Sequence, residues 1–137
     1  MTETKINLLV IDDDEINIFI IKKIVEKTGY PVSMSSKGNG QLAIDYLRAV
    51  LEGNNSFPDL ILVDINMPLM NGWEFLEAYE KLDVPFDAHM YMVSSSVYEN
   101  DIEKAKSYKT IKGFISKPLS IDRLTELLKL IAYKGGD

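Results

Sequence analysis

The chain has 137 residues, of which 46% are hydrophobic and 26% charged, with a formal net charge of −6 and no cysteine. These values are typical of one globular domain with a single core; no apolar stretch approaches the roughly 20 residues of a membrane-spanning helix, and the N-terminus does not resemble a secretion signal. The acidic balance disfavours sequence-independent nucleic-acid binding and the lack of cysteine excludes disulfides and thiolate metal sites, so we expect a cytoplasmic protein that binds small ions and other proteins.

The first half of the chain alternates short apolar runs with amphipathic segments. Residues 8–11 and 60–63 are near-continuous apolar runs, as expected of parallel strands covered on both faces, and residues 32–35 are a weaker strand candidate. Between these runs, apolar residues recur at the spacing of a buried helix face: Ile18, Ile21 and Val25, then Ala43, Leu47, Val50 and Leu51. Asp14 is a candidate N-cap for the first helix, and a polar loop over residues 52–56 follows the second.

The second half continues this alternation with a strand at residues 90–93 and a weaker strand candidate at residues 113–116. Asn71 and Glu74 have the spacing of a capping box, in which each side chain accepts a main-chain amide of the same turn. The apolar residues at helical spacing are Phe75, Tyr79 and Leu82; Ile102 and Ala105; and Leu124, Leu127, Leu128 and Ile131. The chain therefore predicts five strands and five helices in alternation.

This alternation predicts an α/β fold, because right-handed crossovers return the chain to the same edge of a parallel sheet. A closed barrel needs eight strand–helix units and about 250 residues. We therefore expect an open, doubly wound (βα)₅ sheet with helices on both faces. Residues 1–137 are expected to form one domain without an output domain.

Polar side chains follow the carboxyl ends of the predicted strands. Asp12, Asp13 and Asp14 follow the first strand, Asp64 the third, Ser94, Ser95 and Ser96 the fourth, and Lys117 with Pro118 the fifth. Taken singly, each group has a purely structural interpretation, such as a helix cap, a turn residue or a surface lysine. Because ligands of open α/β sheets bind outside the carboxyl ends of the strands, we instead expect these groups to converge on one rim.

A cluster of Asp12, Asp13 and Asp64 predicts a bound divalent cation, because two like charges about 4 Å apart repel by roughly 4 kcal/mol at an effective dielectric constant of about 20. Oxygen ligands favour a hard ion, and a partly hydrated Mg²⁺ beside a phosphate is the usual arrangement. An aspartate carboxylate can then attack phosphorus and form an acyl phosphate. Lys117 and the Ser94 hydroxyl would stabilise the charge of the phosphoryl oxygens.

Together these motifs resemble the receiver domain of the two-component response regulators over essentially the whole chain, and in particular the single-domain regulators of the chemotaxis type. The resemblance implies a flavodoxin-like fold with strand order 2-1-3-4-5. It also implies that Asp64 is the phosphoacceptor and a Mg²⁺ ligand, with Asp13 as a direct ligand. Asp12 would act through water, and the main-chain carbonyl of Asn66 would complete the metal site.

The resemblance also implies two switch residues. Ser94 corresponds to the Ser or Thr whose hydroxyl moves toward the phosphoryl group on activation, and Phe114 corresponds to the aromatic switch position. The Lys117–Pro118 peptide bond is usually cis in the family. The chain departs from the family pattern because Ser94 replaces the commoner Thr, Phe114 lacks the hydroxyl of a Tyr, and residues 108–113 lack the usual Gly-Ala pair. We therefore expect the loop before the fifth strand to run differently.

The implied function is a phosphorylation-controlled signalling module and not a turnover enzyme. A sensor histidine kinase or a His-containing phosphotransfer protein would phosphorylate Asp64, and output would pass to another protein by binding or by phosphorelay. Asn66 and Ser96 occupy positions that modulate the phosphoryl lifetime in the family. A phosphatase of the haloacid-dehalogenase type would need a second aspartate where this chain has Asn66, and a flavin site would need a hydroxyl-rich loop where this chain has three aspartates.

Two aromatic residues have structural interpretations. His89 precedes the fourth strand and so should lie at the end of the sheet away from the acidic residues. Trp73, nine positions after Asp64, is expected to serve in packing. Because it follows Asp64 so closely, we also predict that its fluorescence responds to Mg²⁺.

Overall fold

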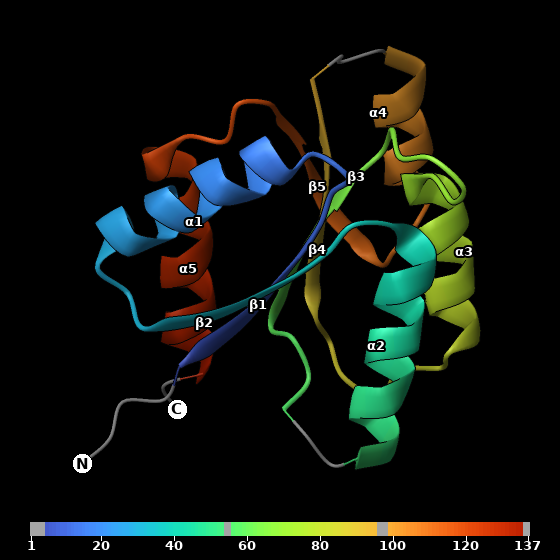
Figure 1. The fold of residues 1–137 in the computed structure, drawn as a ribbon, viewed down its shortest axis with the longest axis horizontal. Coiled ribbons are helices and arrows are strands. Elements are labelled where there is room, and N and C mark those ends of the chain that lie inside the picture. Colours follow the sequence, from blue (N-terminus) through green and yellow to red (C-terminus); the bar gives the residue numbers. More distant parts are fainter. Residues whose placement is uncertain (1–4, 54–55, 96–98, 136–137) are drawn as a thin grey trace.

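The computed structural model describes residues 5–53, 56–95 and 99–135, and within these ranges five strands alternate with five helices (Figure 1). In chain order they are β1 (Ile6–Ile11), α1 (Glu15–Thr28), β2 (Val32–Lys37), α2 (Gly40–Gly53), β3 (Leu60–Asp64), α3 (Gly72–Lys81), β4 (His89–Ser94), α4 (Glu99–Lys106), β5 (Ile111–Ser116) and α5 (Ile121–Gly135). All strands pair in parallel in the order β2-β1-β3-β4-β5. The expected doubly wound fold and its strand order are confirmed.

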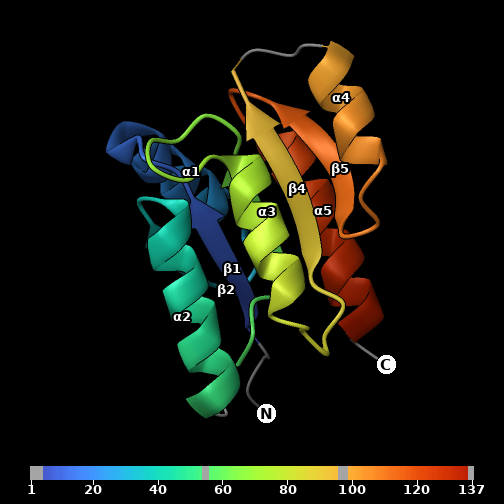
Figure 2. The same ribbon diagram turned by 90° about the vertical axis from the view of Figure 1, so that its right-hand side faces the viewer.

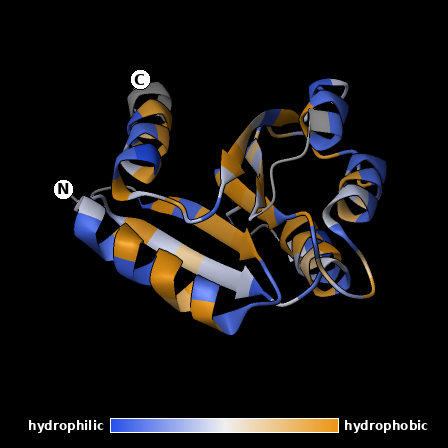
Figure 3. Ribbon diagram, turned by 90° about the horizontal axis from the view of Figure 1, so that it is seen from above, coloured by the Kyte–Doolittle hydropathy of each residue, from blue (hydrophilic) through white to orange (hydrophobic). Residues whose placement is uncertain are grey.

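The helices form two layers, one on each face of the sheet. α1 and α5 lie together on one face, and α2, α3 and α4 lie on the other (Figures 1 and 2). Hydrophobic residues dominate much of the sheet, whereas the helices carry both hydrophobic and hydrophilic residues (Figure 3). No helix within the described ranges is long and apolar enough to cross a membrane.

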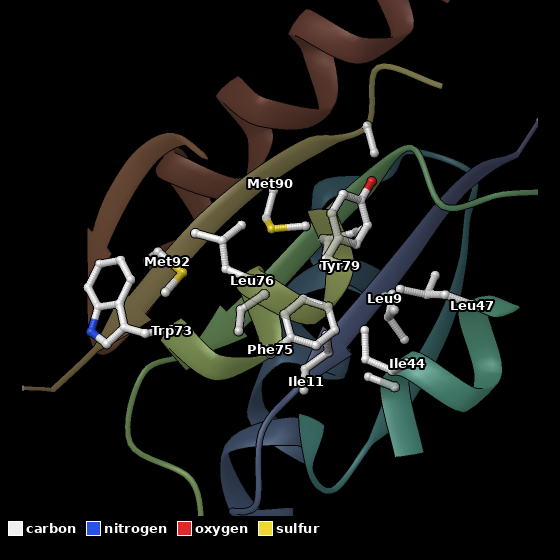
Figure 4. Packing of buried hydrophobic residues seen from close by; sticks show 14 of the residues in the cluster. Leu9, Ile11, Ile44, Leu47, Trp73, Phe75, Leu76, Tyr79, Met90 and Met92 are labelled. Atoms are coloured by element: carbon white, nitrogen blue, oxygen red, sulfur yellow. The ribbon is translucent and has the colours of Figure 1, made fainter. Parts of the chain in front are cut away.

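Each helical layer buries its own hydrophobic cluster against the sheet. Leu9 belongs to the cluster under α2 and α3, together with Phe75 (Figure 4). Leu8 and Val10 belong to the cluster under α1 and α5, together with Leu124. Successive side chains of a strand point to opposite faces. A strand buried on both faces therefore needs an apolar residue at every position, which explains the continuous apolar runs of the sequence.

The predicted helix caps form at the starts of α1 and α3. The Asp14 side chain accepts the main-chain N–H groups of Ile16 and Asn17. Asn71 and Glu74 make the two reciprocal hydrogen bonds of a capping box. These bonds satisfy amides that have no partner inside the helix and so define where each helix begins. Both helices begin in the loops that follow β1 and β3, where the acidic residues lie.

Two element boundaries differ from the sequence prediction. α2 extends through Gly53, so residues 52 and 53 of the predicted loop belong to the helix, while residues 54 and 55 lie outside the described ranges. Glu52 is a good helix former, and glycine is common at helix ends. β5 begins at Ile111, earlier than the predicted residue 113, and its register with β4 shifts so that Lys112 is the extra residue of a β-bulge. The bulge falls in the segment that departs from the family pattern.

Candidate functional site

The carboxyl ends of four parallel strands bring the predicted polar residues to one rim of the sheet. Asp12 follows β1 directly, Asp64 and Ser94 are the last residues of β3 and β4, and Lys117 follows β5. The strand register pairs Asp64 with Val93, the residue before Ser94. The main-chain N–H of Lys117 donates to the Ser94 carbonyl over 2.8 Å, which carries the pairing of β4 and β5 past the strand end. The sheet itself therefore assembles the site.

Three carboxylates form the centre of this rim, and we call them the acid cluster: Asp12, Asp13 and Asp64. Each offers one carboxylate oxygen, and these three oxygens lie within 4.8 Å of one another. Asp12 and Asp64 are 2% and 6% exposed, whereas Asp13 is exposed to solvent. A compact set of oxygen donors with one solvent-facing member fits a partly hydrated hard cation such as Mg²⁺.

Lys117 is the positive partner of both buried carboxylates. Its Nζ lies 3.1 Å from Oδ2 of Asp12 and 3.4 Å from Oδ2 of Asp64. The side chain of Lys117 is only 17% exposed, so the two ion pairs are shielded from bulk water. The Lys117–Pro118 peptide bond is cis, as the family resemblance implied.

Asp12 is oriented by two further donors. Its Oδ1 accepts the main-chain N–H of Asp14 over 2.8 Å, and its Oδ2 accepts the side-chain amide of Asn17 over 2.6 Å. These bonds use part of the acceptor capacity of Asp12 and hold it beside Lys117. Sequence reasoning missed Asn17. The sequence does place the Asn17 amide on the first turn of the helix after Asp12. Whether it reaches Asp12 depends on the path of residues 12–14, which the sequence pattern does not give.

The pKa values of Asp64 and Lys117 reflect burial and mutual charge. Burial raises the pKa of Asp64 above its ordinary value of 3.8; the positive charge of Lys117 opposes this increase, and the negative charge of Asp12 adds to it. Burial lowers the pKa of Lys117, but the hydrogen bond and charge of Asp12, with the charge of Asp64, outweigh burial and raise it. Lys117 therefore stays protonated at neutral pH, and the ionised Asp64 carboxylate is stabilised by any additional positive charge.

Asn66 and Ser94 flank the Asp64 carboxylate. The main-chain N–H of Asn66 donates to Oδ1 of Asp64 over 3.2 Å, which places residue 66 against the carboxylate. Ser94 is 1% exposed and ends the strand beside β3. The metal-binding role of the Asn66 carbonyl and the phosphoryl-stabilising role of the Ser94 hydroxyl stay predictions. Ser96 lies outside the described ranges.

Gly72 holds the loop after β3 close to the sheet. Its N–H donates to the carbonyl of Ile65 over 2.8 Å. A Cβ atom at residue 72 would lie 2.9 Å from both the carbonyl oxygen of Asp64 and the Cα of Ile65, so only glycine permits this approach. Only the structure shows this packing of Gly72 against the backbone of Asp64.

The contacts of three other residues singled out from the sequence are with groups outside the acid cluster. Phe114 is half-buried in β5 and packs in the cluster under α2 and α3, so its role as a switch stays a prediction. Trp73 is 8% exposed and stacks on Tyr108 with 6.2 Å between ring centroids, as expected of a packing residue. Its response to Mg²⁺ stays a prediction. His89 is the first residue of β4 and therefore lies at the strand end opposite Ser94, as expected.

Exposed apolar side chains lie on the two segments that follow Asp12 and Asp64 in the sequence. Ile16 and Phe19, in the first turns of α1, are 73% and 58% exposed, and Leu69 in the loop after β3 is 90% exposed. Leu69 also has a φ of 69°, in the left-handed region that is unusual for a branched residue. α1 follows Asp12 closely and the Leu69 loop follows Asp64, so both segments leave from the site. Large apolar side chains exposed together are typical of a surface that contacts another protein.

Comparisons with known proteins agree with this arrangement. Residues 8–129 match the family model described as the response regulator receiver domain. The chain is 27% identical to the polar-differentiation response regulator DivK of Brucella anthropi, over 94% of this chain and 96% of that protein. The fold is similar to that of a two-component response regulator from Cytophaga hutchinsonii, with 30% identity, a TM-score of 0.86 and coverage of 95% of this chain and 99% of that chain. It is also similar to the phosphorylated cyanobacterial phytochrome response regulator RcpA, with 26% identity, a TM-score of 0.73 and coverage of 94% and 92%.

Proposed function

Since this chain belongs to the family of response regulator receiver domains, we propose that it is a two-component signalling module in which Asp64 accepts a phosphoryl group with the help of Mg²⁺. The observation that carries the proposal is the convergence of the acid cluster with the Lys117 ammonium group at the carboxyl ends of the strands. Asp64 belongs to the acid cluster and also forms an ion pair with the Lys117 ammonium group. RcpA, a structural relative with 26% identity, is described as phosphorylated, which supports the same chemistry here.

The donor set of the site fits Mg²⁺. We propose Asp13 and Asp64 as direct ligands, Asp12 as a ligand through water, and the main-chain carbonyl of Asn66 as a further ligand. Asp12 already accepts two hydrogen bonds, which agrees with metal binding through a water molecule and not by direct contact. When bound, the ion supplies positive charge that neutralises the carboxylates and the phosphoryl oxygens.

In the proposed transfer, a carboxylate oxygen of Asp64 attacks the phosphorus atom of a phosphohistidine. The new O–P bond forms as the N–P bond breaks, and the departing imidazole takes up a proton. Lys117 stabilises the negative charge of the phosphoryl oxygens, and the Ser94 hydroxyl donates a hydrogen bond to them. The added charge then draws Ser94 and Lys117 toward Asp64 and shifts β4 and β5, where Phe114 lies.

We propose that the phosphodonor is a protein, either a sensor histidine kinase or a His-containing phosphotransfer protein. The exposed side chains of Ile16, Phe19 and Leu69, on the segments that follow Asp12 and Asp64, support a donor with an apolar contact surface. Output would reach a further protein through binding or phosphorelay, with residues 1–137 acting as a single receiver domain. The chain would thus work in the cytoplasm as a phosphoacceptor that does not turn over a metabolic substrate.

Acetyl phosphate separates the phosphoacceptor from its partners. After incubation with acetyl phosphate and Mg²⁺, intact-mass measurement should show one added phosphoryl group on the wild type and none on Asp64→Asn. Asp14→Asn is the matched control, since asparagine also serves as an N-cap for α1, and it should be labelled like the wild type. An adduct that persists in Asp64→Asn, or labelling that is unchanged when EDTA removes Mg²⁺, would contradict the proposal.

A further inference from the structure

A cavity lies at the end of the sheet opposite the acid cluster. It has a volume of about 310 Å³, and its lining includes Tyr79, Glu80, Asp83, Phe86, Asp87 and Thr110. β4 runs from His89 near this cavity to Ser94 at the rim. At about 3.3 Å per residue its length separates the two sites by roughly 20 Å. A group bound in this cavity therefore leaves Asp64 accessible.

The lining of the cavity is acidic. Glu80, Asp83 and Asp87 contribute three carboxylates. Asp87 pairs with Lys112 over 3.1 Å, and Glu80 accepts a hydrogen bond from the Thr110 hydroxyl over 3.1 Å. No ion pair involves Glu80 or Asp83 in the part of the chain that the structure describes. Among the described residues, the carboxylates of Glu80 and Asp83 therefore leave the lining of the cavity with an excess of negative charge.

Two aromatic rings form an apolar part of the wall. Tyr79 is 6% exposed and so is held firmly in the core, whereas Phe86 is 56% exposed. The ring of Phe86 packs against Phe57 with 5.3 Å between centroids. The faces of aromatic rings attract organic cations, and this attraction increases when the cation is partly desolvated.

The hydroxyl group of Tyr79 has hydrogen-bonding capacity to spare. Across the described ranges no hydrogen bond involves this group, and its oxygen is not sealed inside the protein. Figure 4 shows the ring at the edge of the labelled core side chains, with the oxygen pointing away from them. Burial and the negative charge of Asp87 raise the pKa of Tyr79 to about 12, so the hydroxyl stays neutral at physiological pH. A neutral phenol oxygen can accept a hydrogen bond from a ligand N–H group.

We propose that this cavity binds the charged end of a lysine or arginine side chain from a partner protein. The carboxylates of Glu80 and Asp83 would pair with the cation, and the Tyr79 oxygen would accept one of its N–H groups. The exposed face of Phe86 would contact its methylene stem. The volume of about 310 Å³ suits one such group. The site does not depend on phosphorylation of Asp64, so it would dock a partner of either state of the protein.

Nuclear magnetic resonance can test the site one residue at a time. The ¹⁵N-labelled full chain, with saturating Mg²⁺ at the acid cluster, would be titrated with N-acetyl-arginine amide and with its neutral analogue N-acetyl-citrulline amide. We expect saturable shifts of the amide signals of residues 79–88 and 110 with the arginine probe only.

Two variants test the proposed contacts. Tyr79→Phe and Asp83→Asn should each lower the affinity for the arginine probe by about fivefold. Asparagine tolerates the left-handed φ of 54° at residue 83, so this variant removes the charge and keeps the turn. Asp122→Asn, an exposed aspartate on α5, is the matched control and should bind like the wild type.

Three results would overturn the proposal. The first is the absence of saturable shifts in residues 79–88, and the second is an equal response to the citrulline analogue. The third is an unchanged affinity for the arginine probe in both variants, when their spectra show that they are folded. Spermidine, a free polyamine, would be titrated in parallel. If it bound the same residues more than about tenfold more tightly than the arginine probe, the cavity would be a polyamine site and a partner side chain would not be its ligand.

Discussion

The metal-free Asp64→Asn variant is expected to be more stable than the wild type at neutral pH, because the carboxylate is buried and its charge interactions in the site nearly cancel. Asp12 and Asp64 place oxygens at most 4.8 Å apart, which gives a repulsion of at least about 3.5 kcal/mol at an effective dielectric constant of about 20. The exposed Asp13 adds about 1 kcal/mol at the dielectric constant of water. Lys117, 3.4 Å from Asp64, attracts it by about 5 kcal/mol. These charge interactions nearly cancel, so the burial of the carboxylate decides the sign.

Neutral asparagine removes the cost of burying a charge while its side-chain oxygen can still accept the N–H of Asn66. We expect a gain of about 1 kcal/mol, or roughly 4 °C in Tm for a chain of this length. Because the pKa of Asp64 is raised, the folded protein binds this proton more tightly than the unfolded chain does. The stabilisation from protonated Asp64 is complete below the unfolded pKa near 3.8 and is lost as the pH rises through the folded pKa. The advantage of Asp64→Asn should therefore be small at about pH 4 and full at neutral pH.

Urea unfolding in EDTA at several pH values measures this difference, with Asp14→Asn as the control for loss of a nearby charge. Addition of Mg²⁺ should reverse the order, because the wild type gains RT ln(1 + [Mg²⁺]/Kd), about 2.7 kcal/mol at 100 times Kd, and the variant gains less. A variant that is no more stable than the wild type in EDTA at neutral pH, or a difference that does not change with pH, would refute this reasoning.

Three further predictions concern the metal site, the loop after β3 and the surface beside the cluster. Asp13→Ala should abolish the increase in Tm that Mg²⁺ causes, because it removes the solvent-facing carboxylate; an increase as large as in the wild type would contradict the metal assignment. Gly72→Ala should destabilise the protein by about 2–3 kcal/mol in chemical denaturation, since its Cβ would meet main-chain atoms at 2.9 Å, whereas Gly38→Ala, with nothing within 4 Å, should have little effect. Phe19→Ser should slow phosphotransfer from a protein donor by about tenfold and leave labelling by acetyl phosphate unchanged; equal slowing of both would place Phe19 in the chemistry.

Much of this protein could be predicted from local patterns in the sequence. Continuous apolar runs mark strands buried on both faces, because such strands have no solvent-facing position. Asp14 and Asn71 mark helix starts, because a capping bond joins residues only two or three positions apart. The sequence also predicted that Asp64 and Lys117 lie at one rim, since parallel strands present their carboxyl ends on the same side.

Only the tertiary structure decided how these groups meet. The ion pairs of Lys117 depend on the register of β5 against β4, and the bulge that sets this register has no clear local signal. The bond from Asn17 to Asp12 and the approach of Gly72 to the backbone of Asp64 depend on the paths of two loops. The cavity beside Tyr79 combines α3, the loop before β4 and Thr110, which lies near the start of β5. Periodicity reports which face of an element is buried, but contacts between side chains far apart in sequence are determined by packing, and packing involves the whole chain at once.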